Sequence, residues 1–440
     1  MSILEIEGRH KLEGRIRISG SKNSGLAVLA GSLLCNKPVT FVGLPDITDI
    51  FSMNQLLVDL GSKISFDATK IKKYDVNHPV MVIDNSNIIK YVAEYDFVKK
   101  MRASIFVLGP LLSRFGKAKV SMPGGCAIGV RAVDLHIKGL EAMGAKIEIN
   151  NGYIVAEAKN GLNGCEFEFP KDRIPSVGAT ENLLTAAVLA KGKTVLKHAA
   201  KEPEIVALAE FLISIGALIR GHGTDVIEIE GVDIDDLRST EYKVPSDRIE
   251  AGTFAIAAAI TDGQIYLQHC DMSLFDSVKT EFDAIGIGLK ESEYDGVKCV
   301  YAYKSHDFQP CNISTAVYPG FPTDLQAQIM VPLLLAKGTS KVEENIFENR
   351  FMHVAELNRM GANITIKGNT ATIEGNANLK SANLMATDLR ASASLVLASL
   401  IAEGRSRIDR IYHLDRGYEN LELKLNNCGA KIKRIAKTIM

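Results

Sequence analysis

Six strongly apolar segments recur along the chain. A helix that is apolar on every side must be buried in the protein interior. A glycine directly follows five of the six segments, where a helix C-terminus favours a left-handed backbone, and a β-like run comes next. The segments span residues 26–35, 105–115, 183–191, 253–262, 326–337 and 394–403, and the glycines are Gly116, Gly192, Gly263, Gly338 and Gly404. The pattern predicts six buried helices, most of them leading into a strand.

A second element repeats equally often. It is an amphipathic helical pattern that ends in a glycine and continues as a short β-like run, as in MGAKIEI and MGANITI. The first glycines of the six copies are Gly61, Gly144, Gly216, Gly286, Gly361 and Gly429. Their spacing of about seventy residues indicates one repeated structural unit. Each unit is predicted to hold an apolar helix, an amphipathic helix and several short strands.

Together the two repeats predict an α/β fold in which sheets enclose buried helices. The chain has 440 residues, too many for one ordinary core, so six units divide naturally into two domains of three. A solenoid is the competing architecture. Its repeats are typically about 20 to 50 residues long, which is shorter than the units of this chain.

The charge, the apolar runs and the cysteines argue against several kinds of partner and site. With 51 basic and 52 acidic residues, the formal net charge is -1, so no overall field favours nucleic acid or a membrane surface. No apolar run approaches the ~18 residues that a membrane span requires. The seven cysteines are odd in number and include no C-x-x-C pair, which argues against a disulfide framework or a cysteine-based zinc site. We expect a protein of the reducing cytoplasm with no metal site.

Cations stand at the predicted N-termini of several buried helices, namely Lys22, Arg102, Arg248 and Arg390. The helix dipole is unfavourable for positive charge at that end. The unpaired amides there bind anions, and a nearby cation strengthens such a site. Helix capping is the alternative role for the polar residues at these positions, and it suffices for the threonines among them. The cations favour a ligand that bears phosphate or carboxylate groups.

The segment PGGCAIGVR places Cys126 in a glycine-rich loop five residues before Arg131. Glycines let the backbone approach a ligand closely. A guanidinium near a thiol favours the thiolate or attracts an anionic substrate. The alternative is a flexible loop with an incidental cysteine. The arrangement is typical of a reactive site.

Nine motifs carry a resemblance to a known family. In order they are GSKNSGLAVLAGSLL, MRASIFVLGPLLSRFG, PGGCAIGVRAVDLHIKGLEAMGA, SVGATENLLTAA, DRIEAGTFAIAAAI, FPTDLQAQ, IFENRFMHVAELNRMGA, ATDLRASASLVLA and DRIYHLDRGYENLE. With them the chain resembles the UDP-N-acetylglucosamine 1-carboxyvinyltransferases, which are enolpyruvyl transferases. The resemblance implies an inside-out α/β barrel of six βαβαββ units with an active site between two domains. One domain would span residues 22–245, and residues 1–21 with 246–440 would form a discontinuous second domain.

The family's reaction joins the enolpyruvyl group of phosphoenolpyruvate to the 3-hydroxyl of UDP-N-acetylglucosamine and releases phosphate, the first committed step of peptidoglycan precursor synthesis. Addition and elimination each need a proton donor and a proton acceptor. By resemblance, Cys126 is the acid and the site of a covalent adduct, and Asp324 is the base. The positions that match phosphoenolpyruvate ligands are Lys22, Asn23, Arg131 and Arg416. No cofactor is implied.

A second set of positions matches the UDP-sugar site. It comprises Arg102, Arg131, Ala132, Val133, Asp134, Leu135, Ser176, Val177, Asp324 and Ile346. Val133, Leu135 and Val177 are equally compatible with a role in the core. Asp388 and Arg390 are expected to form a structural ion pair that shapes the cleft.

The chain departs from the family pattern at two places. Ala132 stands where many members have proline, which leaves the φ angle of the loop less constrained. Ile174 precedes Pro175 and Ser176 where some members carry a lysine, so a contact to the nucleotide is absent or comes from elsewhere, such as Arg173. Some members have aspartate in place of the loop cysteine. The thiol of Cys126 implies sensitivity to fosfomycin.

Two alternatives stay open at this point. One is the sister enzyme that uses shikimate 3-phosphate, for which we expect no cysteine loop of this type. The other is a non-catalytic UDP-sugar sensor, which the joint presence of Lys22, Cys126, Asp324 and Arg416 disfavours. We expect a monomer with small-molecule substrates.

Overall fold

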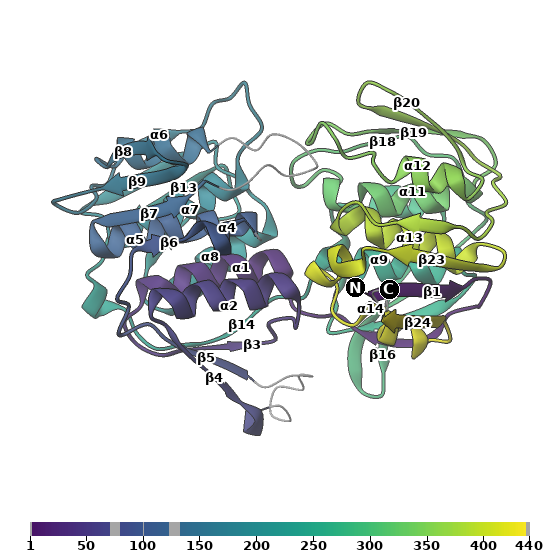
Figure 1. The fold of residues 1–440 in the computed structure, drawn as a ribbon, viewed down its shortest axis with the longest axis horizontal. Helices are drawn as coiled ribbons and strands as arrows, with labels where there is room; N and C mark the ends of the chain where they lie inside the picture. The colour runs from purple at the N-terminus through teal and green to yellow at the C-terminus, as the bar shows by residue number, and fades with distance from the viewer. Residues whose placement is uncertain (1, 71–79, 100, 123–132, 437–440) are drawn as a thin grey trace. The chain divides into compact units, whose positions relative to one another are not determined.

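The structure, a computed structural model, describes residues 2–70, 80–99, 101–122 and 133–436. The described residues form two compact units, coloured by residue number in Figure 1. The first unit holds residues 2–19 and 246–436, and the second holds residues 20–70, 80–99, 101–122 and 133–245. Each unit has its own hydrophobic core.

The first unit contains three four-stranded sheets. Their strand orders are β22 (Asn383–Met385), β23 (Arg405–Asp409), β1 (Ser2–Glu7) and β24 (Lys431–Ala436); β2 (Glu13–Arg17), β15 (Gln264–Gln268), β17 (Val297–Lys304) and β16 (Ile287–Tyr294); β18 (Ile313–Ser314), β19 (Thr339–Glu343), β21 (Thr370–Glu374) and β20 (Asn363–Lys367). In each sheet the first pair is parallel and the other two pairs are antiparallel.

The second unit repeats this plan. Its sheets are β14 (Glu241–Lys243), β3 (Val39–Val42), β5 (Val80–Asp84) and β4 (Lys63–Asp67); β6 (Val92–Ala93), β7 (Lys117–Ser121), β9 (Tyr153–Glu157) and β8 (Lys146–Asn150); β10 (Glu166–Glu168), β11 (Lys193–Lys197), β13 (Val226–Glu230) and β12 (Leu218–Arg220). The pairings again run parallel, antiparallel and antiparallel. The same four-stranded arrangement therefore occurs six times, in agreement with the six predicted units.

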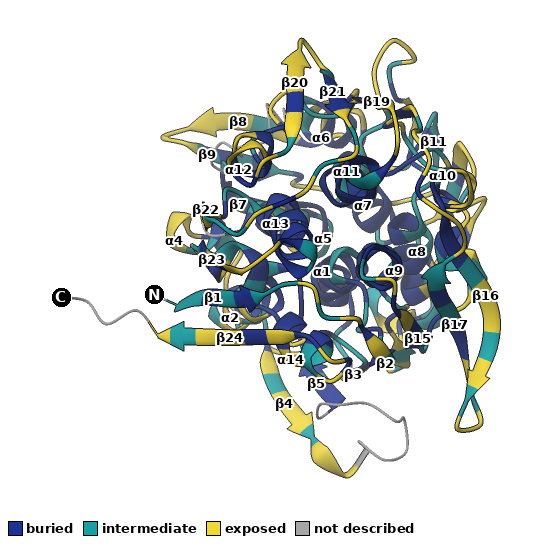
Figure 2. Ribbon diagram, turned by 90° about the vertical axis from the view of Figure 1, so that its right-hand side faces the viewer, coloured by how far each residue is buried: buried dark blue, intermediate teal, exposed yellow. Residues whose placement is uncertain are grey.

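One buried helix belongs to each sheet. These helices are α1 (Lys22–Gly31), α5 (Leu108–Phe115), α7 (Val177–Ala187), α9 (Arg248–Ile260), α11 (Gln326–Leu335) and α13 (Leu389–Ile401). Every residue of α9 from Ile249 to Ile260 is buried, and Figure 2 shows α11 and α13 of the first unit mostly in the buried colour. Within that unit α9, α11 and α13 contact one another, and they pack against β15, β19 and β23 respectively. The six predicted buried helices are confirmed.

Six amphipathic helices complete the repeats. They are α2 (Thr48–Leu60), α6 (Asp134–Ala142), α8 (Pro203–Ser214), α10 (Lys279–Ile285), α12 (Val354–Arg359) and α14 (Leu421–Asn426). The remaining helical segments are α4 (Tyr95–Val98) and the 3-10 turns η1 (Ser32–Leu34), η2 (Ala68–Lys70), η3 (Arg102–Val107), η4 (Ile234–Asp236), η5 (Met272–Phe275), η6 (Thr323–Leu325) and η7 (Ile411–Arg416). The fold is thus mixed α/β with helices inside and sheets outside, as predicted. Among the described residues no sheet closes into a barrel.

Two strands, β2 and β14, lie in one unit while the helix that follows each of them lies in the other unit. β2 precedes α1 of the second unit but pairs with β15 of the first. β14 precedes α9 of the first unit but pairs with β3 of the second. The chain passes from one unit to the other directly after each of these strands. Consequently α1 and α9 both begin immediately after a crossover.

The prediction for the glycine after α9 was wrong. The residue with a left-handed backbone there is Asp262, at a φ of 50°, and Gly263 is not left-handed. A Cβ on Gly263 would lie 2.2 Å from the carbonyl oxygen of Leu12. Glycine is therefore required by the close approach of β2 and β15, and not by the end of the helix.

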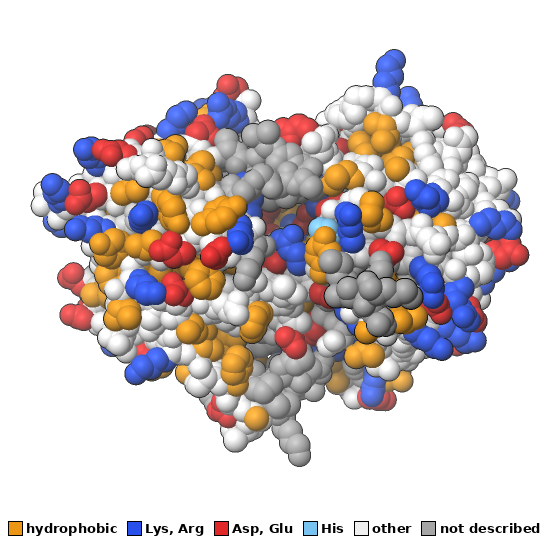
Figure 3. All heavy atoms as spheres, viewed as in Figure 1, with side chains coloured by type: hydrophobic (Ala, Val, Ile, Leu, Met, Phe, Trp, Pro, Cys, Tyr) orange, Lys and Arg blue, Asp and Glu red, His pale blue; other side chains and the backbone are white. Residues whose placement is uncertain are grey.

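The exposed surface carries both signs of charge. Figure 3 shows lysine and arginine side chains interspersed with aspartate and glutamate over the visible face, in keeping with the net charge of -1. Within the part of the chain that the structure describes, no helix is both long and apolar enough to span a membrane. The six described cysteines are unpaired thiols.

Candidate active site

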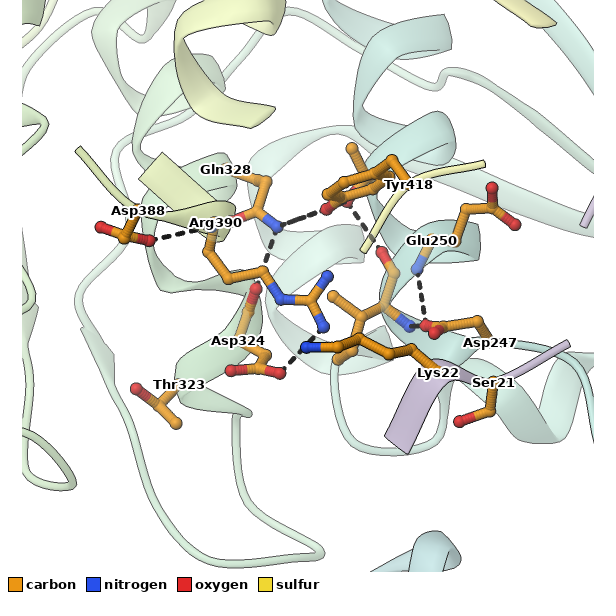
Figure 4. Close-up of polar contacts among 12 residues, drawn as sticks. Ser21, Lys22, Asp247, Glu250, Thr323, Asp324, Gln328, Asp388, Arg390 and Tyr418 are labelled. Atoms are coloured by element: carbon orange, nitrogen blue, oxygen red, sulfur yellow. Dashed lines mark hydrogen bonds and ion pairs between the residues drawn. The ribbon is translucent and has the colours of Figure 1, made fainter. Parts of the chain in front are cut away.

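Asp324 lies in η6, at the entrance to the buried helix α11, between two arginines. Its Oδ1 accepts a hydrogen bond from Arg350 at 2.7 Å, and its Oδ2 accepts one from Arg390 at 2.9 Å. The arginine side chains are only 5% and 4% exposed, whereas the side chain of Asp324 is 26% exposed. The carboxylate is thus held in a fixed orientation by two buried positive charges, and Figure 4 shows its contact with Arg390.

The two arginines determine the charge of Asp324. Burial raises the pKa of this carboxyl, but the charges of Arg390 and Arg350 and their hydrogen bonds outweigh burial, so its pKa lies well below the usual value. Burial lowers the pKa of Arg390, but the charge of Asp324 outweighs that effect and raises it. The three groups therefore stay ionised together near neutral pH.

The expected ion pair between Asp388 and Arg390 was wrong. Asp388 is the N-cap of α13, and its Oδ1 accepts the backbone amides of Arg390 at 2.9 Å and Ala391 at 3.0 Å. An N-cap carboxylate is directed at amides two and three residues ahead. The guanidinium of Arg390 instead reaches Asp324 and lies over the ring of Tyr418, 5.5 Å from its centroid.

A neutral hydrogen-bond network lies behind this charged cluster. Gln328, one turn after Asp324 on α11, donates to the carbonyl of Asp324 at 2.9 Å and to the Tyr418 hydroxyl at 3.1 Å. The Tyr418 and Thr253 hydroxyls are 2.8 Å apart. This network ties the turn that carries Asp324 to α9 and to the segment after η7. Figure 4 shows the Gln328 amide between the Tyr418 hydroxyl and the carbonyl of Asp324.

Sequence reasoning missed Arg350, Gln328, Tyr418 and Thr253. Arg350 lies in the quoted motif IFENRFMHVAELNRMGA, and Gln328 stands four residues after Asp324, which is one helical turn. The motif and the helical spacing could therefore have identified Arg350 and Gln328 from the sequence. Tyr418 and Thr253 also lie in quoted motifs, but those motifs come from distant parts of the chain, and no local pattern shows that the two hydroxyls meet.

Lys22 is the first residue of α1 in the second unit. Ser21 caps this helix and accepts the amide of Ser24 at 3.2 Å. The ammonium of Lys22 forms an ion pair with Asp49 of α2 at 3.0 Å, and the side chains are 14% and 3% exposed. Asn23, the next residue, is partly buried. Asp49 offsets the unfavourable position of a cation at a helix N-terminus, and sequence reasoning missed it.

The expected UDP-sugar positions of the second unit lie on three elements. Arg102 opens η3, Asp134 opens α6, and Ser176 caps α7 by accepting the amide of Ala179 at 3.2 Å. Val177, the first residue of α7, is partly buried. Val133 and Leu135 are each 7% exposed, and both pack in the core of this unit.

Asp134 has two cationic neighbours. Its Oδ2 pairs with Arg173 at 2.8 Å and with Lys138 at 3.5 Å. Burial raises the pKa of Asp134, but the hydrogen bond and charge of Arg173, with those of Lys138, lower it overall. Arg173 is the cation that the sequence suggested as a replacement for the missing lysine, and in the structure it contacts Asp134.

A buried neutral network connects α6 with α7. Asn182 accepts the amide of Gly109 at 2.8 Å, donates to the carbonyl of Ile105 at 3.0 Å, and lies 2.8 Å from Nδ1 of His136. Burial and the charge of Arg102 lower the pKa of His136 to about 4. His136 is therefore neutral at pH 7. This network, also missed from sequence, fixes the start of α6 relative to α7.

The remaining expected residues divide between the first unit and the residues that are not described. Ile346 follows β19, and Arg416 ends η7. Cys126, Arg131 and Ala132 lie outside the described residues. Among the residues that the structure describes, no group of three or more His, Cys, Asp or Glu side chains is arranged to hold a metal ion.

Comparison with known proteins identifies relatives over almost the whole chain. The family model described as EPSP synthase (3-phosphoshikimate 1-carboxyvinyltransferase) matches residues 6–425. A UDP-N-acetylglucosamine 1-carboxyvinyltransferase of Pelagibacter ubique is 51% identical over 99% of this chain and 100% of its own length. The protein of the same name from Thermodesulfovibrio yellowstonii is 50% identical over the same shares.

Two solved structures have similar folds. The enolpyruvyl transferase NikO from Streptomyces tendae superposes with a TM-score of 0.87 at 23% identity, covering 98% of both chains. EPSP synthase from Acinetobacter baumannii superposes with a TM-score of 0.74 at 17% identity, covering 99% of this chain and 100% of that one. At these identities the likeness concerns the fold alone.

Proposed function

The chain belongs to the EPSP synthase family, among its UDP-N-acetylglucosamine 1-carboxyvinyltransferases, and from this premise we propose that it transfers the enolpyruvyl group of phosphoenolpyruvate to the 3-hydroxyl of UDP-N-acetylglucosamine. The observation that carries the proposal is identity of 51% to a protein of that name, over 99% of this chain. The arginine-held carboxylate of Asp324 gives it a chemical basis.

The proposed reaction has two steps that balance in atoms and protons. In the addition, the 3-hydroxyl oxygen bonds to C2 of phosphoenolpyruvate, Cys126 protonates the methylene carbon, and Asp324 takes the hydroxyl proton. In the elimination, the methyl carbon returns a proton to the Cys126 thiolate, the bond from C2 to the phosphate oxygen breaks, and phosphate leaves with the proton that Asp324 took in the addition. Each step needs one acid and one base in place at the same time.

The low pKa of Asp324 has a consequence for its role. A carboxylate that two arginines stabilise is a weak base, so it would not remove the hydroxyl proton before the attack. We infer that proton transfer to Asp324 accompanies formation of the bond to C2, when the hydroxyl becomes strongly acidic. The arginines then serve mainly to fix the direction of the carboxylate.

Phosphoenolpyruvate is a small, densely charged anion and needs several cationic donors. We assign this role to Lys22, Arg131 and Arg416, with Asn23 as a polar contact beside Lys22. The ion pair of Lys22 with Asp49 positions the ammonium before substrate arrives. The positions assigned to UDP-N-acetylglucosamine are Arg102, residues 131–135, Ser176, Val177, Asp324 and Ile346.

A second acceptor deserves a direct test, because the matching family model is described by the shikimate 3-phosphate reaction. Phosphate release from phosphoenolpyruvate is measured with either UDP-N-acetylglucosamine or shikimate 3-phosphate as the acceptor. We expect release only with the UDP-sugar, and loss of that release in Cys126→Ser. Release with shikimate 3-phosphate alone would replace the proposal, and release with neither acceptor would refute enolpyruvyl transfer.

We further propose that the protein acts as a monomer in the bacterial cytoplasm, at the first committed step of peptidoglycan precursor synthesis. Its described cysteines are unpaired, which suits a reducing compartment, and the relatives are bacterial.

Intact-mass measurement after incubation with fosfomycin provides a test of the loop thiol, because the adduct is expected on Cys126.

A further inference from the structure

Glu344 is a buried carboxylate in the first unit to which the proposed reaction assigns no role. It follows β19 and is 3% exposed. Its Oε1 accepts the Thr315 hydroxyl at 3.0 Å and the amides of Ile346 and Phe347 at 2.9 and 3.1 Å. Its Oε2 accepts the Thr323 hydroxyl at 2.8 Å. Four donated hydrogen bonds suit the anionic carboxylate and leave little freedom of movement.

The bond to Thr323 connects Glu344 to Asp324. A threonine hydroxyl has only one proton to donate, and that proton points to Glu344. The Thr323 oxygen therefore faces Arg350 as an acceptor, and Nη1 of Arg350 donates to it at 2.9 Å. Nη2 of the same guanidinium donates to Asp324 at 2.7 Å. Glu344 thereby takes the one Thr323 proton and leaves the Thr323 oxygen to accept from Arg350, whose guanidinium can only donate.

The other oxygen of Glu344 fixes the turn that carries Ile346. The amides of Ile346 and Phe347 both point to Oε1. Thr315 joins the same arrangement, because its hydroxyl donates to Glu344 and accepts the amide of Asn345 at 2.9 Å. One carboxylate therefore holds the turn on one side and the Asp324 cluster on the other.

We propose that Glu344 is a positioning residue that aligns Arg350 with Asp324 and at the same time places the Ile346 turn for the UDP-sugar. This inference rests on the proposed function, which assigns the base to Asp324 and a sugar contact to Ile346. Glu344 itself touches neither reacting group. It acts through Thr323 on catalysis and through the turn on binding of the acceptor substrate.

Glu344→Gln tests the proposal because it keeps the size and removes the charge. A carboxamide has one acceptor oxygen and one donor NH₂, so it cannot accept on both sides. Either the Thr323 bond or the three bonds on the other side must be lost. The matched control is Glu343→Gln, because Glu343 is the exposed neighbour on β19 and undergoes the same change of charge.

In Glu344→Gln we expect kcat to fall by about 10- to 100-fold, the range for a misplaced catalytic group. The acid limb of the kcat profile should move to higher pH, because a displaced Arg350 stabilises the Asp324 carboxylate less. The charged groups that face Asp324 are Arg350 and Arg390, and both remain in this variant. A purely structural role would lower the melting temperature without moving that limb.

Two further variants separate the two sides of Glu344. Thr323→Val should lower kcat by a larger factor than it raises the KM for UDP-N-acetylglucosamine, and Thr323→Ser should restore kcat because it restores the hydroxyl. Thr315→Val should mainly raise that KM. These variants also keep the proposal testable if Glu344→Gln does not fold.

Each result has one meaning. If Glu344→Gln and Thr323→Val match wild type and Glu343→Gln in kcat, KM and pH profile, the positioning role is refuted while the proposed function stands. If wild type itself fails to use UDP-N-acetylglucosamine, the proposed function is refuted directly. A fall in kcat and a displaced acid limb in Glu344→Gln and Thr323→Val, together with a restored kcat in Thr323→Ser, support the role of the Thr323 connection.

Discussion

Asp324 of the first unit and Glu181 of the second are both carboxyl groups on or beside a buried helix, and their surroundings differ. Asp324 stands between Arg350 and Arg390. Glu181 lies within α7, is 3% exposed, and has an Oε2 with no hydrogen-bond partner among the residues that the structure describes. Burial and the nearby carboxyls of Glu204 and Glu202 raise the pKa of Glu181 well above its usual value, whereas the pKa of Asp324 is well below its own.

The contrast shows that charged partners decide whether the effect of burial on a carboxyl group is reversed or left in place in this fold. Burial raises the pKa of both groups. At Asp324 two arginines lower the pKa by more than burial raises it. At Glu181 the neighbouring carboxyls raise the pKa further, in the same direction as burial. Repeated architecture therefore supplies similar buried helices, and the side chains added around them determine whether an ionised or a neutral acid results.

The largest expected effect follows from removing the charge of Asp324. In Asp324→Asn the shape of the side chain is kept, but the proposed proton acceptor is lost, so turnover should fall by about 10²- to 10⁴-fold. The measurement is the initial rate of phosphate release with saturating substrates. Turnover within about twofold of wild type would show that Asp324 is not the base, because general-base catalysis contributes more than that.

A smaller effect is expected from removing one arginine. In Arg350→Met the pKa of Asp324 should rise. The substitution breaks the buried ion pair between Arg350 and Asp324, and we expect this loss to lower the unfolding free energy by roughly 3 kcal/mol near neutral pH. Because the folded pKa of Asp324 is lowered, its stabilisation is complete above the ordinary value of 3.8 and is lost as pH falls below it.

Denaturant unfolding of both proteins between about pH 6 and 3 tests this expectation. The difference between wild type and Arg350→Met should shrink as pH falls, since protonation removes the charge that Arg350 stabilises. A difference that does not depend on pH would indicate lost packing alone.

The smallest effect is expected at Glu181, and its pH dependence has the opposite sign. Because the folded pKa is raised, the contribution of Glu181 to stability is complete below the ordinary value of 4.5 and is lost as pH rises through the folded pKa. Glu181→Gln cannot ionise, so it should gain on wild type as pH rises, by at most about 1.4 kcal/mol per pH unit.

Unfolding free energies from about pH 5 to 8 measure that gain. The control is Glu230→Gln, at an exposed position of β13 in the same unit, which should show no such trend. A flat difference between wild type and Glu181→Gln over this range would mean that Glu181 is ionised in the folded protein.

Local patterns predicted the repeated elements, because each buried or amphipathic helix is encoded by its own residues. They also identified Lys22 as a candidate, whereas Asp324 was assigned as the base through the family resemblance. They did not reveal that Arg390 pairs with Asp324, 66 residues away, instead of with Asp388 beside it. An aspartate at a helix start is committed to the backbone amides ahead of it, so proximity in sequence was misleading.

Partners brought together by the tertiary fold were the least predictable. Asp49 pairs with Lys22 from the neighbouring helix, and Tyr418 reaches Arg390 from beyond η7. The reason for glycine at position 263 was equally unpredictable, because the steric constraint comes from the carbonyl of Leu12, which is distant in the chain. Such contacts depend on strand pairing between remote segments, which a local pattern does not encode.

The most direct test of enolpyruvyl transfer is a competition between the two possible acceptors. The protein is incubated with phosphoenolpyruvate and equal amounts of UDP-N-acetylglucosamine and shikimate 3-phosphate, and the products are identified by mass spectrometry. Our account predicts that the UDP-sugar alone gains the enolpyruvyl group, with one phosphate released for each molecule formed. An enolpyruvyl product of shikimate 3-phosphate, or no product at all, would contradict it.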